Sequence, residues 1–594
     1  MSKGLQIDGL ETDWPNCRVL IADRDPAARS LLIAMLRDFG VLPDNVQQAA
    51  RVQEARQWLE TQHYDIVLCD YHFGPDEMSG QDLLDELRRT HALPLTTVFV
   101  MVTAEASYAK VAEAAESALD SYLLKPHNAQ SLGERLALAR HRKLTLSDIY
   151  AAIEAGEFDQ AIHLCLERYH AGKRYGLYAA RVAAELMLRR RRPDDAHELF
   201  QALDEARGLP WARLGMARAH LEAGRIEPAS QTLHELIEQQ PTYADAYDLM
   251  GRAHLEQGEF SAAMQTYARA ADLTPGSISR QQKLGMMAYY LGDQGLASRA
   301  LQAACELSVH AKSFDHQSLV LMAFMQFEQG DEPALTGSAQ LLAAARQRRD
   351  GDPRLGRMLQ VVEMLRAMLA RRVSTVIQDL QRLAQDYTRA DFDMEAACNA
   401  LTLLAHLRHA DLDLPQAPEW IDILARRFCT SKAASALLAR ACACHEPFAT
   451  RVKEAHVEIG GWAERALQHA VQQAPDKAVQ TLLAQGRQTM NVKLLELAGM
   501  VLQRHRDDMI DPAPLARALN ELRERMSPAP LPLARPPSGM REPGGLALRA
   551  PRLAELPAPG RRPFDVRPLL FGACCLAPPG RPVLLCPALS IQPL

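Results

Sequence analysis

The chain has 594 residues, a length that suits about four domain-sized units. Hydrophobic residues make up 48% and charged residues 24% of it, an ordinary globular composition that excludes wholesale disorder. The net charge of −6 argues against a chain built mainly to bind nucleic acid. Because no long apolar run and no apolar signal segment is present, we expect a cytoplasmic protein that does not contact the membrane.

The first 142 residues alternate apolar runs with segments of helical period. Strands are predicted at 18–22, 46–49, 65–69, 97–102 and 121–125. Helices are predicted between and after them, at 26–39, 51–61, 80–90, 107–118 and 129–141. This alternation predicts a doubly wound α/β domain, a (βα)5 unit whose parallel sheet is covered on both faces.

Chemically active side chains follow four of these strands. Asp23 follows the first, Asp70 the third and Thr103 the fourth, while Lys125 ends the fifth. Because the carboxyl ends of parallel strands meet at one edge of a sheet, the four groups should converge there. Two carboxylates, a hydroxyl and an ammonium are suited to a phosphorylatable aspartate, because they supply a nucleophile, a site for a hard cation and ligands for phosphoryl oxygens.

Four strings carry a family resemblance: IADRDPAAR, LCDYHFGPDEMSG, VMVTAEA and SYLLKPHN. Together they resemble the receiver domain of bacterial two-component response regulators, over about 16–142. The resemblance implies that Asp70 is the phosphoacceptor and that Thr103 and Lys125 bind the phosphoryl group. It also implies that Tyr122 is an aromatic side chain whose rotamer follows activation.

A magnesium ion is the cofactor that the resemblance implies. Its ligands would be Asp23, Asp70 and the backbone carbonyl of His72. The peptide bond between Lys125 and Pro126 is expected to be cis, as bonds before proline allow.

The position after Asp23 departs from the family, which places two adjacent acids there. Here the second position holds Arg24, and the next acid is Asp25. An arginine adds positive charge where a cation should bind. Three outcomes stay open: Asp25 reaches the metal, Arg24 points away and leaves a weaker site, or the receiver is never phosphorylated. The other matching residues favour a phosphorylatable site.

The middle of the chain, 143–526, is rich in helix-forming residues and carries an internal repeat. The string AHLEAG, ending at Gly224, recurs as AHLEQG, ending at Gly258, and Gly292 continues the spacing of 34 residues. Projection backwards gives Gly156 and, between it and Gly224, a degenerate copy at Arg190. These positions predict turns between antiparallel helices, where glycine adopts a left-handed backbone at little cost.

This stretch resembles the tetratricopeptide repeat (TPR) family, clearly over 211–308 and more loosely over 148–210. The resemblance implies an all-α superhelix with a protein-binding face. We expect repeats over 143–310 and degenerate helical repeats over 311–526, with a separate helical domain as the alternative. Helices in the degenerate part are predicted at 355–370, 374–387, 393–408, 461–474 and 491–504.

Two terminal segments complete the division of the chain. Residues 1–15 form an N-terminal extension, and 527–594 form a Pro- and Arg-rich tail that lacks lysine and is expected to be disordered. The composition of the tail also raises the hypothesis of a shifted reading frame.

The run Arg189–Arg192 is expected to lie in solvent at a helix end, with contact to an acidic partner as the alternative.

These features predict a response regulator without a catalytic output domain, since no motif of a common enzyme class is found. Its expected partners are a sensor histidine kinase or phosphotransfer protein, a protein ligand of the repeats, and a second copy in a homodimer. One alternative is a constitutive scaffold with a degenerate receiver. Another is a transcriptional regulator with a DNA-binding segment hidden in 350–526.

Overall fold

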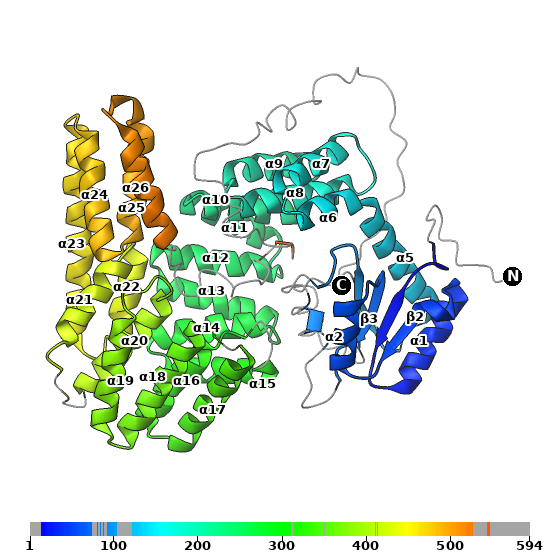
Figure 1. Ribbon diagram of the computed structural model, residues 1–594, viewed down its shortest axis with the longest axis horizontal. Helices are drawn as coiled ribbons and strands as arrows, with labels where there is room; N and C mark the ends of the chain where they lie inside the picture. The colour runs from blue at the N-terminus through cyan, green and yellow to red at the C-terminus, as the bar shows by residue number, and fades with distance from the viewer. Residues whose placement is uncertain are drawn as a thin grey trace.

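The computed structural model contains a small α/β unit at the N-terminus and a long array of helices after it (Figure 1). The residues that it describes are 13–73, 80, 83–84, 87, 92–103, 121–126, 128–309, 314–349, 351–409, 412, 414–526, 543, 545 and 546.

The α/β unit is built on a parallel sheet in the order β2-β1-β3-β4-β5. Each neighbouring pair is parallel, so all five strands end at the same edge. The predicted strands are confirmed to within one residue at each end. They are β1 (Val19–Ala22), β2 (Val46–Ala49), β3 (Ile66–Asp70), β4 (Val98–Thr103) and β5 (Ser121–Leu124).

Both faces of the sheet are covered, as the alternation predicts. The helical elements described here are α1 (Pro26–Phe39), η1 (Pro43–Asn45), α2 (Val52–Thr61) and α5 (Ala129–Thr145). Val19 and Ile21 of β1 face a core shared with α1 and α5, and Leu20 faces the core that includes α2. Strands buried on two sides need such continuous apolar runs. The helix predicted at 107–118 and most of 80–90 lie outside the described residues.

The α/β unit is joined to the array almost without a linker. Helix α5 ends at Thr145 and α6 begins at Ser147, so only Leu146 separates them. Leu95, in the loop before β4, packs into the apolar core of α6 to α10. The two parts are therefore in direct contact through side chains as well as through the chain.

The array consists of helices that pack mainly against their neighbours in sequence. Its first half contains α6 (Ser147–Glu154), α7 (Phe158–His170), α8 (Gly176–Arg189), α9 (Pro193–Arg207), α10 (Pro210–Glu222), α11 (Ile226–Gln239), α12 (Ala244–Gln257), α13 (Phe260–Leu273), α14 (Ile278–Leu291), α15 (Gln294–Ser308) and α16 (Gln317–Gln329). Its second half contains α17 (Glu332–Arg348), α18 (Pro353–Leu369), α19 (Val373–Gln385), α20 (Met394–His409), α21 (Ala417–Phe428), α22 (Lys432–Ala441), α23 (Glu446–Val471), α24 (Pro475–Thr489), α25 (Val492–Arg504), η2 (Arg506–Asp508) and α26 (Pro512–Arg525).

The turns between paired helices confirm the glycine prediction and correct one position. The repeated glycines have φ between 70° and 83°. In the degenerate copy the left-handed residue is Arg191 with φ 55°, one residue after the predicted Arg190, because this repeat contains one extra residue. The confirmed glycines are Gly156, Gly224, Gly258 and Gly292, and Gly330, after α16, has the same left-handed backbone.

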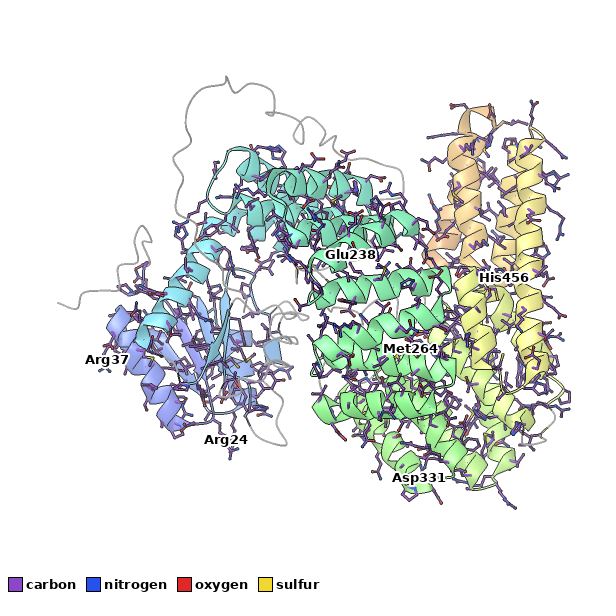
Figure 2. The ribbon with its side chains drawn as sticks, turned by 180° about the vertical axis from the view of Figure 1, so that it is seen from behind. Arg24, Arg37, Glu238, Met264, Asp331 and His456 are labelled. Atoms are coloured by element: carbon purple, nitrogen blue, oxygen red, sulfur yellow. The ribbon has the colours of Figure 1, made fainter. Side chains whose placement is uncertain are left out.

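The later helices continue the packing of the repeats. One apolar core extends from Leu255 in α12 to Ala455 in α23, across the point where the sequence period fades. The last helices have a core of their own, from Ile459 to Met526. They return beside the first repeats (Figures 1 and 2). Of the tail, only residues 543, 545 and 546 are described, so the prediction of disorder lies outside the described residues.

Candidate functional site

Three charged side chains meet at the carboxyl edge of the sheet. The ammonium Nζ of Lys125 lies 2.7 Å from Oδ2 of Asp23 and 3.2 Å from Oδ2 of Asp70. Asp23 follows β1, Asp70 ends β3 and Lys125 follows β5, so the parallel topology brings together residues that are far apart in sequence. The predicted convergence of these three groups is observed.

Thr103 is linked to this ion-pair cluster through the backbone of Lys125. Thr103 ends β4 and is buried, and its carbonyl accepts a hydrogen bond of 2.7 Å from the backbone N–H of Lys125. The Lys125–Pro126 peptide is cis, as expected. His72 lies two residues beyond Asp70, and its side chain is exposed. Tyr122 lies in β5, but its side chain is not among those described.

The charges of the cluster favour a bound cation. Burial, followed by the negative charge of Asp23, raises the pKa of the Asp70 carboxyl. Burial lowers the pKa of Lys125, but its hydrogen bond to Asp23 and the charges of both carboxylates outweigh this effect and raise it. Two carboxylates therefore face a single ammonium, which leaves excess negative charge at the strand ends.

Backbone hydrogen bonds fix both carboxylates. Oδ1 of Asp70 accepts a bond of 2.8 Å from the N–H of Tyr71, so Oδ2 is the atom turned toward Lys125. Oδ1 of Asp23 accepts a bond of 2.8 Å from the N–H of Asp25. The nucleophilic candidate and its neighbour are thus oriented before any ligand binds.

The residues after Asp23 occupy positions outside this cluster. Asp25 is the N-cap of α1, where its carboxylate accepts a bond of 2.9 Å from the N–H of Ala27. The side chain of Arg24 is exposed and lies at the periphery of the α/β unit (Figure 2). Arg24 is thus exposed and Asp25 is engaged as a cap, while the strength of the metal site and the phosphorylation of the receiver stay predictions.

Sequence reasoning missed two residues that shape the site. The guanidinium of Arg29 donates to the carbonyls of Asp23 at 2.6 Å and Arg24 at 3.1 Å, so it holds the loop that bears both. Gly80 lies against the backbone of Asp70, and a Cβ added to it would be 2.1 Å from the Asp70 carbonyl oxygen. The sequence signal for each was only its place within a matching string.

Comparisons with known proteins identify this part of the chain. The family model described as "Response regulator receiver domain" matches residues 19–137. The chemotaxis protein CheY-3 of Vibrio cholerae is 33% identical over 121 residues, which cover 20% of this chain and 89% of that protein. The chemotaxis protein CheY of Pseudomonas aeruginosa is 32% identical over 119 residues, 20% of this chain and 92% of that protein. The chain belongs to the response regulator receiver family.

Part of the array also matches a family model. A family model described as "Tetratricopeptide repeat" matches residues 187–252. Among solved structures, the receiver domain of the Francisella response regulator 1452 is 26% identical, covers 21% of this chain and 98% of that chain, and has a TM-score of 0.19. The receiver of this two-component response regulator is thus followed by tetratricopeptide repeats.

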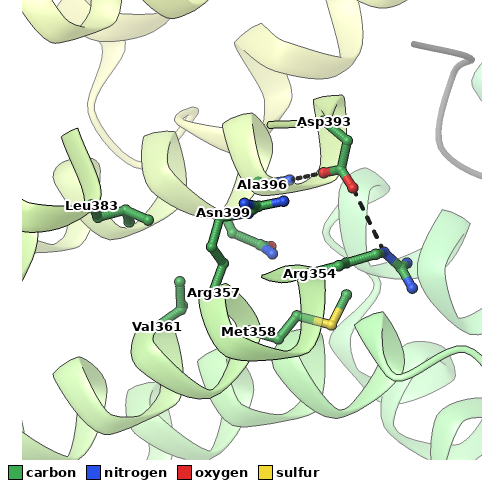
Figure 3. Close-up of a pocket in the computed structure, with 8 residues that line it drawn as sticks. All are labelled: Arg354, Arg357, Met358, Val361, Leu383, Asp393, Ala396 and Asn399. Carbon is green, nitrogen blue, oxygen red and sulfur yellow. Dashed lines mark hydrogen bonds and ion pairs between the residues drawn. The ribbon is translucent and has the colours of Figure 1, made fainter. Parts of the chain in front are cut away.

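The array contains a small pocket between α18, α19 and α20. Its charged groups already have partners: Arg354 lies 3.7 Å from Asp393, and Asp393 caps the N–H of Ala396 (Figure 3). Arg354 also pairs at 2.8 Å with Asp315, which lies outside the pocket lining. Burial raises the pKa of the neighbouring Glu395 carboxyl. This arrangement joins helices α16, α18 and α20. The pocket is lined by Arg354, Arg357, Met358, Val361, Leu383, Asp393, Ala396 and Asn399.

The basic run Arg189–Arg192 is not in solvent, which corrects the prediction for all but Arg191. Arg190 pairs with Asp159 at 2.9 Å, and Arg192 pairs with Asp195 at 2.6 Å. The acids come from neighbouring helices of the same chain. The searched, described helices include none that is long and apolar enough to cross a membrane.

Proposed function

We propose that this chain is a response regulator in which Asp70 accepts a phosphoryl group and the helical array carries the response to a protein partner. The observation that carries the proposal is the cluster in which Lys125 bridges Asp23 and Asp70. The donor would be a histidine kinase, a phosphotransfer protein or a small phosphodonor. Asp70 attacks phosphorus, its new O–P bond forms as the donor's bond to phosphorus breaks, and the electron pair leaves with the donor.

The residues around Asp70 suit the other roles in this transfer. Lys125, already within 3.2 Å of Asp70, and Thr103 would bind oxygens of the acyl phosphate. Tyr122, in β5, would follow this change. Because Thr103 and Lys125 are joined through the backbone at 2.7 Å, a movement of one displaces the other.

The donor set fits a magnesium ion. Two buried or half-buried carboxylates beside one ammonium leave excess negative charge, which suits a hard divalent cation. Asp23, Asp70 and the backbone carbonyl of His72 would hold the ion, and when bound it would neutralise phosphoryl oxygens. Asp25 is already engaged as a helix cap, so it is a weak candidate ligand.

The output would pass from the receiver to the repeats through α5. This helix packs on the sheet and leads into α6 after the single residue Leu146. Because the connection is short and the loop at Leu95 is held against the array, a shift in the receiver changes the position of the first repeats. The proposed response is altered binding of a protein partner or altered pairing in a homodimer. We propose no catalytic output and a cytoplasmic location.

The test is hydrogen exchange on the full chain, with and without a small phosphodonor and magnesium. The proposal predicts changed exchange in the segment around Leu95 and in α5 and α6 of the wild type. It predicts no change in Asp70→Asn, while Asp44→Asn, an exposed control in η1, behaves as the wild type. Changes confined to the receiver would contradict the proposed route to the array.

A constitutive scaffold with an unphosphorylated receiver is the second candidate, and Arg24 is the observation that favours it. Its guanidinium adds positive charge next to Asp23 in sequence. Under this function Asp70→Asn leaves partner binding unchanged and no acyl phosphate forms. The two functions therefore differ in a directly measurable covalent product.

A further inference from the structure

A short piece of the C-terminal segment lies against the first repeats. The side-chain Nη2 of Arg189 donates a hydrogen bond of 2.6 Å to the carbonyl oxygen of Leu546. Gly545 is buried, and the half-buried side chain of Leu546 packs against the apolar core of α6 to α10. A residue far from the repeats in sequence thus makes both a polar and an apolar contact with them.

The surface that receives Leu546 is built around a buried ion-pair cluster. Glu185 of α8 is only 3% exposed, and its carboxylate pairs with Arg189 at 3.1 Å and with Arg218 of α10 at 2.8 Å. Burial would raise the pKa of Glu185, but the two arginines lower it to about 2. Arg189 is therefore held in place before it reaches the carbonyl of Leu546, which reduces the entropic cost of that contact.

Helix α22 covers a later part of the array, beyond α10. α22 packs on α12 and α14, and a Cβ added to Gly258, after α12, would lie 3.7 Å from the Cα atom of Ala433. The guanidinium of Arg440 in α22 lies 5.3 Å from the ring centre of Phe260, at the start of α13. In the described chain, α8 and α10 instead present the Arg189 cluster to residues 545 and 546. The contact at Leu546 thus occupies a part of the array that α22 does not reach.

The chain can reach this surface from its own last helix. Arg191, between α8 and α9, interacts electrostatically with Glu496 of α25 and Arg523 of α26, so the end of the array lies beside the same turn. The residues between Met526 and Leu546 can span up to about 70 Å when extended. Because Leu546 is covalently linked to the array over a span of this length, its local concentration at the surface is raised, which favours the contact within one chain over contact with a second copy.

We propose that the segment around Leu546 is an intramolecular ligand of the surface formed by α8 and α10, which we name the Arg189 surface. A protein partner that binds there presents an extended segment with an apolar side chain and an accessible carbonyl, and it displaces Leu546. The proposal goes beyond the phosphorylation of Asp70 and does not depend on it, because every contact lies within the array and the tail.

The test uses a fluorescently labelled peptide of residues 541–551 and the full chain. Leu546→Asp in the chain places a charge in the apolar contact and should vacate the Arg189 surface without touching the array's own core. The peptide should then bind this variant at least about tenfold more tightly than the wild type, in which the tethered segment competes. Anisotropy of the label measures both affinities.

Three controls sharpen the result. A chain with Leu570→Asp carries the same charge elsewhere in the tail and should bind the peptide as weakly as the wild type. A peptide with Leu546→Asp should bind neither chain. Arg189→Met, introduced into the Leu546→Asp chain, should weaken peptide binding about tenfold while the circular dichroism of the helices is kept.

Two results would overturn the proposal. Equal affinity of the peptide for the wild type and Leu546→Asp would show that the chain's own segment does not occupy the surface. Absence of binding to the Leu546→Asp chain would show that the surface is not a peptide site. Both readings are made without phosphodonor, so they are independent of whether Asp70 is phosphorylated.

Discussion

Lys143 of α5 donates a hydrogen bond of 2.6 Å to the carbonyl oxygen of Leu95, in the loop before β4. The N–H of Leu95 donates at 2.5 Å to Glu154 of α6, so two adjacent helices hold both backbone groups of one residue. The side chain of Leu95 packs with Leu146 and Ile149 at the base of the array. The receiver therefore contacts the first repeat through the loop at Leu95 as well as through α5.

Loss of the hydrogen bond between Leu95 and Glu154 should lower the stability of the chain measurably. Glu154→Ala leaves the N–H of Leu95 without its carboxylate partner and should lower the free energy of unfolding by about 1–3 kcal/mol. Glu157→Ala, at an exposed position in the next turn, should change it by less than about 0.5 kcal/mol. Urea denaturation of the two variants checks the difference, and equal effects would contradict the role given to Glu154.

Replacement of glycine by alanine should change stability in opposite directions at two helix positions that differ in how closely they are packed. A Cβ on Gly251 of α12 would lie 2.4 Å from the ring of Tyr267, so Gly251→Ala should destabilise the chain by about 1–3 kcal/mol. Gly337 in the middle of α17 has no such neighbour, and Gly337→Ala should stabilise it by up to about 1 kcal/mol. Thermal unfolding followed by circular dichroism gives the sign of each change.

The low pKa of the Glu185 carboxyl should make the free energy of unfolding depend on pH. Its folded pKa of about 2 lies below the ordinary value of 4.5, so its contribution is complete above about pH 4.5 and is lost as the pH falls toward 2. The full contribution is about 3 kcal/mol, of which about 2 kcal/mol is lost by pH 3. Glu185→Gln should lack this part of the profile, while the exposed control Glu235→Gln should parallel the wild type. Urea midpoints between pH 7 and pH 3 provide the measurement.

Arg24 should set the magnesium requirement of the receiver. Arg24→Asp replaces a positive by a negative charge beside Asp23, so the magnesium concentration for half-maximal phosphorylation should fall about threefold to tenfold. Arg37→Asp makes the same charge change at an exposed position near the end of α1 and should leave it within twofold. An unchanged requirement in Arg24→Asp would show that this position does not influence the metal.

The α/β unit was largely predictable because its local and long-range signals agree. The three central strands β1, β3 and β4 are apolar runs, and parallel topology then brings Asp23, Asp70 and Lys125 to one edge. The arrangement of the loop after Asp23 was not predictable. It depends on Arg29, in the first turn of α1, whose side chain donates to the carbonyls of Asp23 and Arg24 before the helix, and no periodicity predicts such a contact.

The later repeats were harder to predict because their turns lack the diagnostic residue. Arg371, Gln473 and Met490 take left-handed backbone with φ near 56–59°, where the earlier repeats have glycine. A side chain in this conformation costs about 1–2 kcal/mol, and the surrounding helix packing offsets it. The contact of α22 with α12 has no signal in the sequence either, because it joins helices far apart in the chain.

Intact-mass measurement of the full chain with a small phosphodonor tests the central claim most directly. We expect an adduct of one phosphoryl group in the wild type that requires magnesium and that is absent from Asp70→Asn. Absence of the adduct in the wild type with magnesium, or the same adduct in Asp70→Asn, would contradict phosphorylation of Asp70 and would favour the scaffold.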